Sequence, residues 1–128
     1  MRAAKTVLLV DDDGDFVEMN RVVLEEKGYT VRTAFNGAQC MEQVASDKPD
    51  VIILDMMMED RNEGFNLSRE LRNSEYTKDI PLIMITSVHE TIPFRIEPDK
   101  TWLPVDTLLE KPVDPALLLS VVEKVLSR

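Results

Sequence analysis

The chain has 128 residues, and its 24 acidic and 15 basic side chains give a formal net charge of −9 at pH 7. This length suits one domain, which would bury roughly two-thirds of the surface of the unfolded chain in a single core. The negative charge repels nucleic-acid phosphates and anionic lipid headgroups, so we expect this chain to bind neither DNA nor a membrane surface.

Targeting and redox features favour a cytoplasmic protein. No apolar stretch approaches the ~20 residues that a membrane-spanning helix needs. The apolar run near the N-terminus meets three acids without a small-residue cleavage site, so it is not a signal peptide. Cys40 is the only cysteine, which excludes an internal disulfide, and we expect it to be a buried structural thiol on a helix.

Short apolar runs alternate with segments of helical periodicity in the first half of the chain. Residues 5–10 form a β-branched and leucine-rich run of strand length. Apolar residues then recur at helical spacing until Gly28, which favours a helix C-terminus. Residues 29–34 alternate like a strand, and residues 37–46 have helix-forming composition. The pattern predicts two strand–helix units.

The second half continues the alternation. It contains a fully apolar strand at 51–54, an amphipathic helix at 65–73, a buried strand at 81–86 and a short strand at 107–110. A final helix is predicted to begin with Asp114 as its N-cap and with a proline at its first position. Its apolar face consists of Leu118, Val121, Val122 and Val125.

The predicted strands are apolar at nearly every position, which indicates burial on both faces. In a chain that alternates strands and helices, this pattern predicts an α/β fold, (βα)5, with a parallel sheet between two layers of helices. There are no repeats or linkers, so residues 1–128 are interpreted as one domain. Ligands of such folds bind beyond the carboxyl ends of the strands.

Polar side chains follow the predicted strands at this edge. They are Asp11, Asp12 and Asp13 after the first strand, Asp55 at the end of the third, Thr86 at the end of the fourth and Lys111 after the fifth. Asp13 or Asp15 is expected to act as a cap of the first helix. The remaining carboxylates would repel one another at close range, and a cation would resolve that repulsion.

The carboxylate oxygens make a hard donor set that suits Mg²⁺. The sequence has no cluster of cysteine and histidine to support a zinc site. A calcium loop centred on Gly14 is rejected, because its first and last positions would fall on Leu9 and Asn20.

The stretches "VLLVDDD", "VIILDMMM", "LIMITS" and "LLEKPVD" occur in this order and on these predicted strands. Together they resemble a response-regulator receiver domain of two-component signalling, with a likeness to chemotaxis regulators. The resemblance covers essentially the whole chain. It implies a flavodoxin-like, doubly wound sheet of five parallel strands in the order 2-1-3-4-5.

The resemblance also implies roles for the polar residues. Asp11 and Asp12 correspond to the acidic pair that organises Mg²⁺, and Met57 would offer its backbone carbonyl to the metal. Asp55 corresponds to the aspartate that accepts a phosphoryl group from a histidine kinase or a histidine phosphotransfer protein. Such a domain signals by protein contact, as a monomer or weak dimer, and is not an enzyme beyond its own phosphoryl acceptance and loss.

Thr86 corresponds to the hydroxyl residue that hydrogen-bonds the phosphoryl group, and Lys111 to the lysine that pairs with it. The switch position three residues before this lysine, usually aromatic in the family, is Leu108. Three prolines lie between 87 and 106, so we expect the fourth helix to be short or irregular and this segment, with Trp102, to rearrange on activation.

The loop after Asp55 also departs from the family pattern. The family's proline four residues after the acceptor is replaced by Glu59, and its glycine eight residues on is displaced to Gly64, nine residues on.

Two alternatives stay open. A haloacid-dehalogenase-like phosphotransferase would need a second acid two residues after Asp55, where Met57 stands. A pseudo-receiver, which keeps the fold as an interaction module without phosphorylation, is favoured mildly by Leu108 and disfavoured by the intact set of polar residues.

Overall fold

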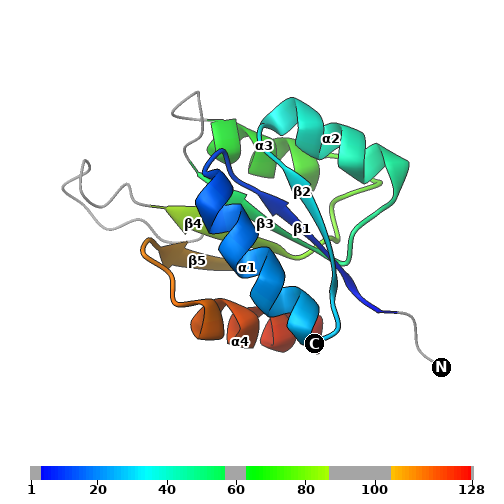
Figure 1. The fold of residues 1–128 in the computed structure, drawn as a ribbon. Helices are drawn as coiled ribbons and strands as arrows, with labels where there is room; N and C mark the ends of the chain where they lie inside the picture. Colours follow the sequence, from blue (N-terminus) through cyan, green and yellow to red (C-terminus); the bar gives the residue numbers. More distant parts are fainter. Residues whose placement is uncertain (1–3, 57–62, 87–104, 128) are drawn as a thin grey trace.

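The computed structural model describes residues 4–56, 63–86 and 105–127. Within them, five strands form one sheet in the order β2-β1-β3-β4-β5 (Figure 1). The strands are β1 (Thr6–Val10), β2 (Thr30–Ala34), β3 (Val51–Asp55), β4 (Leu82–Thr86) and β5 (Thr107–Glu110). Every neighbouring pair is parallel, so the predicted strand order and direction are confirmed.

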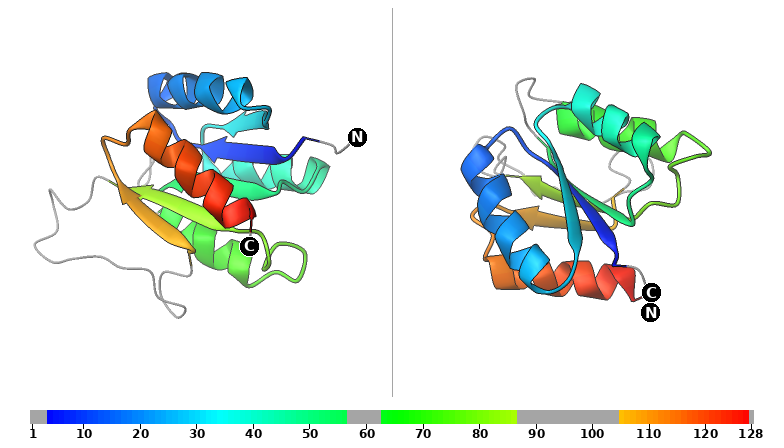
Figure 2. Two further views of the ribbon diagram at one scale, coloured as in Figure 1. Left: turned by 90° about the horizontal axis from the view of Figure 1, so that it is seen from below. Right: turned by 45° about the vertical axis from the view of Figure 1, so that its right-hand side comes forward.

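Helices cover both faces of the sheet, as Figures 1 and 2 show. The helices α1 (Gly14–Glu26) and α4 (Pro115–Leu126) pack on one face, and α2 (Gly37–Ser46) and α3 (Glu63–Arg72) on the other. This is the predicted doubly wound, flavodoxin-like α/β architecture. The expected irregular helix and Trp102 fall in residues 87–104, outside the described ranges. Within those ranges, every helix is too short or too polar to cross a membrane.

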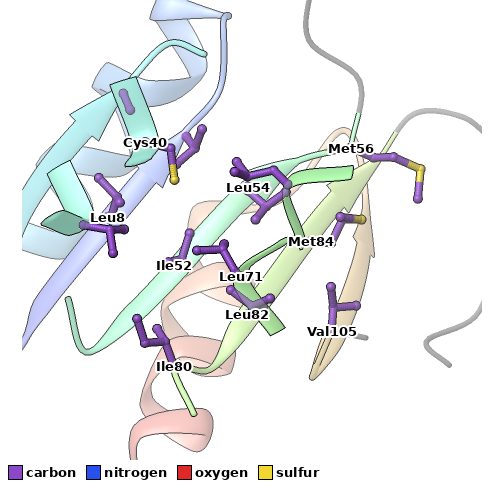
Figure 3. Close-up of a cluster of buried hydrophobic side chains, with 14 residues drawn as sticks. Leu8, Cys40, Ile52, Leu54, Met56, Leu71, Ile80, Leu82, Met84 and Val105 are labelled. Atoms are coloured by element: carbon purple, nitrogen blue, oxygen red, sulfur yellow. The ribbon is translucent and has the colours of Figure 1, made fainter. Parts of the chain in front are cut away.

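Alternate side chains of each central strand pack on opposite faces of the sheet. In β1, Leu8 and Val10 join the cluster beneath α2 and α3, whereas Val7 and Leu9 join the cluster beneath α1 and α4. Burial of each such side chain contributes about 1.5–3 kcal/mol. Cys40 is fully buried in the first cluster (Figure 3), as predicted, and burial raises the pKa of its thiol to about 12.

Local signals in the sequence set most helix ends. Asp13 is the N-cap of α1, where its side chain accepts hydrogen bonds from the backbone N–H groups of Asp15 and Phe16. Gly28 follows this helix with φ +96°, a left-handed conformation that favours glycine. Asp114 caps α4 with a proline at the next position. The caps expected from the sequence are therefore confirmed.

The start of α3 differs from the prediction. The helix begins at Glu63, two residues before the predicted start at residue 65. The Glu63 carboxylate accepts a hydrogen bond from the backbone N–H of Gly37, at the start of α2. A negative charge near the N-terminus of α2 also interacts favourably with the dipole of that helix. A contact between two helices therefore supports the first turn of α3, and periodicity within one segment cannot reveal it.

Candidate functional site

The neighbouring strands β1, β3, β4 and β5 end at the same edge of the sheet (Figure 1). The predicted polar residues lie at these strand ends. Asp55 is the last residue of β3 and Thr86 the last residue of β4. Asp11 directly follows β1, and Lys111 directly follows β5. Because the strands are parallel and adjacent, their carboxyl ends meet, as the sequence predicts.

Backbone hydrogen bonds continue beyond the strand ends and hold the site residues. The N–H of Asp11 donates to the carbonyl of Ala34 over 3.1 Å, and the N–H of Met56 donates to Ile85 over 2.8 Å. The N–H of Lys111 donates to the carbonyl of Thr86, also over 2.8 Å. The sheet therefore fixes the backbone that carries each functional side chain.

Three carboxylates converge at this edge. Asp11, Asp12 and Asp55 each offer an oxygen, and these oxygens lie within 4.8 Å of one another. Asp11 and Asp55 are buried, at 2% and 6% exposure, whereas Asp12 is exposed. Partial desolvation and the neighbouring Asp11 carboxylate raise the pKa of Asp12. Three clustered hard oxygen donors, two of them desolvated, suit a divalent cation such as Mg²⁺.

The Lys111 ammonium bridges two of these acids. Its Nζ lies 2.9 Å from Asp11 Oδ2 and 3.5 Å from Asp55 Oδ2. Burial of the ammonium acts to lower the pKa of Lys111, but the hydrogen bond to Asp11 and the charges of the acids outweigh it, so this pKa is raised. The Lys111 ammonium is thus held beside Asp11 and Asp55 in its charged form.

Thr86 lies on β4, next to the strand that carries Asp55, and is buried at 2% exposure. Its hydroxyl donates toward the Met56 sulfur over 3.7 Å. Leu108, at the position where the family usually has an aromatic residue, is partly buried and packs against the core beneath α2 and α3. As a residue of β5, it therefore places an apolar side chain on that face of the sheet.

Gly64 packs directly against the backbone of Asp55. Its N–H donates to the carbonyl of Met56 over 3.0 Å. A Cβ at this position would lie 1.9 Å from the carbonyl oxygen of Asp55. The displacement of this glycine is visible in the sequence, but its close approach to β3 is not.

Sequence reasoning missed Phe16, which lies at the site. Phe16 reads as an ordinary apolar position of α1, yet its ring centroid lies 4.8 Å from Lys111 Nζ. No signal in the sequence predicts this contact between the two ends of the chain. Met57, the predicted source of a metal-binding carbonyl, lies outside the described residues. Asp13 serves as a helix cap, and its N–H donates to Asp11 Oδ1 over 2.9 Å.

Comparison with known proteins agrees with this geometry. The response regulator receiver domain family matches residues 7–123. The phosphate regulon transcriptional regulatory protein PhoB of Pseudomonas aeruginosa is 36% identical over 127 residues, which are 97% of this chain and 52% of PhoB. The chain thus spans about half the length of that relative.

Solved structures show the same architecture. The chemotaxis response regulator CheY4 of Vibrio cholerae matches with a TM-score of 0.79 and 28% identity, over 95% of this chain and 98% of CheY4. A putative response regulator from Chloroflexus aurantiacus matches with a TM-score of 0.80 and 28% identity, over 98% and 99% of the two chains. The sheet order, the acidic edge with its lysine and the match over residues 7–123 all agree: the chain belongs to the response regulator receiver domain family.

Proposed function

We propose that this chain accepts a phosphoryl group on Asp55 from a phosphohistidine of a histidine kinase or of a histidine phosphotransfer protein. The observation that carries the proposal is the position of Lys111, whose ammonium lies 2.9 Å from Asp11 and 3.5 Å from Asp55 at the carboxyl edge of the sheet. A cation beside a buried carboxylate is suited to stabilise charge on a phosphoryl group that arrives there.

In the proposed reaction, a carboxylate oxygen of Asp55 attacks phosphorus. A new P–O bond forms as the P–N bond of the phosphohistidine breaks, and the imidazole leaves with the electron pair and takes up a proton. Lys111 then pairs with a phosphoryl oxygen, and the Thr86 hydroxyl donates a hydrogen bond to another. Because a carboxylate is a weak nucleophile, the main contribution of the protein is positioning and electrostatic stabilisation.

The donor set at this edge fits a resident Mg²⁺. Asp11, Asp12 and Asp55 would hold it through carboxylate oxygens, with the backbone carbonyl of Met57 as a further ligand. When bound, Mg²⁺ would neutralise negative charge on the phosphoryl oxygens. Asp11 would exchange its present contact with Lys111 for the metal, which leaves the ammonium available to the phosphoryl group.

We further propose that residues 1–128 act as one receiver domain, cytoplasmic and monomeric or weakly dimeric, which signals by contact with another protein. The chain covers 52% of PhoB, so in a longer regulator the contact would be with a further domain. Phosphorylation adds about two negative charges and strong acceptor oxygens. These shift the conformational equilibrium toward the state that interacts with them more favourably.

The test is phosphorylation by a small donor. The chain is incubated with Mg²⁺ and acetyl phosphate and then weighed intact by mass spectrometry. We expect the mass of one phosphoryl group to be added to the wild type and to be lost with Asp55→Asn, because the amide lacks the nucleophilic charge.

Asp79→Asn is the matched control, because this exposed acid precedes β4 at the opposite end of the sheet and should leave the mass gain unchanged. Full modification of Asp55→Asn would contradict the assignment. An unmodified wild type with its fold intact would favour the pseudo-receiver, an interaction module that is not phosphorylated.

A further inference from the structure

The ring of Phe16 provides a third partner for the ammonium of Lys111. Nζ lies 4.8 Å from the ring centroid, in addition to its contacts with Asp11 and Asp55. A cation within about 6 Å of an aromatic ring is attracted by the negative charge of the ring face. Phe16 is 8% exposed, so little water competes for this contact.

Rigid elements hold both members of this pair. The N–H of Phe16 donates to the Asp13 cap over 3.2 Å, and its carbonyl accepts from the buried Asn20 amide over 2.8 Å. The ring packs in the core beneath α1 and α4. Lys111 is fixed through its N–H at the end of β5. The fold therefore fixes the ring of Phe16 and the backbone of Lys111.

We propose that Phe16 is a positioning residue, which keeps the Lys111 ammonium at the site when its carboxylate partners are engaged elsewhere. The proposal rests on the proposed phosphoryl transfer to Asp55. During that transfer a divalent cation occupies Asp11, and the phosphoryl group occupies an oxygen of Asp55. The ring offers no oxygen to either of them, so its contact with Lys111 persists when the ion pairs of the resting site are exchanged.

This persistence makes the ring more important during transfer than at rest. Lys111 has a flexible stem, and its side chain is 22% exposed, so holding it in one place costs conformational entropy. In the resting site two carboxylates hold the ammonium with or without the ring. An interaction accelerates the reaction only if it is stronger in the transition state than in the ground state. Loss of the ring should therefore slow phosphoryl acceptance without abolishing it.

The test varies the charge of the ring face at nearly constant shape. Phenylalanine at position 16 is replaced by 4-fluoro- and then by 3,4,5-trifluorophenylalanine, and Phe16→Leu removes the ring. We measure the initial rate of phosphorylation by acetyl phosphate with Mg²⁺. The rate should fall in that order, by about two- to fivefold in total, the factor that corresponds to about 0.5–1 kcal/mol of cation–π attraction.

A second readout reports the contact without any phosphoryl chemistry. In a ¹³C–¹H spectrum of the lysine side chains, ring current should displace the ε-methylene signal of Lys111. This displacement should persist in the fluorinated chains and disappear in Phe16→Leu. Because it is independent of transfer, it separates a failure of this inference from a failure of the proposed function, which would appear as a wild type that gains no phosphoryl mass.

Val17→Ala is the matched packing control, because Val17 is buried in the same cluster on the same helix. It should lower stability to urea and leave the rate unchanged. Equal rates across the fluorinated series, or an undisplaced Lys111 signal in the wild type, would overturn the inference. A rate loss in Val17→Ala equal to that in Phe16→Leu would also overturn it, since core packing alone would then explain the effect.

Discussion

Gly64 shows how closely α3 approaches the residue proposed to accept the phosphoryl group. A side chain at this position would begin 1.9 Å from the Asp55 carbonyl oxygen, which is part of the backbone and has little freedom to move. The first turn of α3 therefore has to rest on β3 without an intervening methyl group. The glycine therefore allows this close approach of α3 to the end of β3.

Gly64→Ala should be strongly destabilising for this reason. We expect a loss of about 1–3 kcal/mol in the free energy of unfolding, as for other overpacked sites, together with slower phosphorylation as Asp55 is displaced. Urea unfolding and the acetyl phosphate reaction measure the two effects. Gly14→Ala is the control, since its Cβ would meet nothing within 4 Å. Equal stabilities of the two variants would show that α3 has room to shift.

At the scale of elements, an arginine connects α3 to the start of two strands. Arg72 Nη2 lies 2.7 Å from Asp106 Oδ2, and its Nη1 donates to the carbonyls of Lys78 and Ile80. The same carboxylate oxygen accepts from the N–H of Leu82 over 2.8 Å. The network joins the last turn of α3 to β4 and to the residue before β5, at the end of the sheet opposite the site.

Arg72→Ala should remove this connection. Only 19% of the arginine side chain and 23% of the aspartate side chain are exposed, so both groups lose partners that water replaces only in part. We expect a loss of about 1–3 kcal/mol by urea unfolding. Arg69→Ala, an exposed position on the same helix, should change stability by no more than about 0.5 kcal/mol. A loss of similar size at both positions would count against the network.

The contrast between these elements explains what the sequence could predict. Strands, caps and the convergence of Asp11, Asp55 and Lys111 follow from patterns within short segments and from the geometry of parallel sheets. The contact of Arg72 with Asp106 joins residues 34 apart in the sequence, and neither residue type is unusual at its position. The contact of Phe16 with Lys111 is hidden in the same way, because an apolar residue on a helix face is fully explained by core packing.

At the scale of the whole molecule, a net charge of −9 is concentrated in part at one edge, where Asp11, Asp12 and Asp55 lie together. Partial desolvation, and after it the charge of the neighbouring Asp11, raise the pKa of Asp12 at this edge. Folding brings these carboxylates close together, and their mutual repulsion lowers the free energy of unfolding. A ligand that binds only the folded chain should recover this free energy.

We therefore expect Mg²⁺ to raise the melting temperature of the chain at low ionic strength. A cation at one hundred times its dissociation constant would stabilise the fold by about 2.7 kcal/mol. Asp12→Ala should melt at a higher temperature than the wild type without Mg²⁺, because repulsion is relieved, and its melting temperature should rise less when Mg²⁺ is added.

Asp15→Ala removes an equal charge from the first turn of α1 but leaves the cluster intact, so its response to Mg²⁺ should match that of the wild type. Sodium chloride at equal ionic strength separates binding from screening. If the wild type melts at the same temperature in Mg²⁺ and in sodium chloride, the acidic edge does not bind the cation.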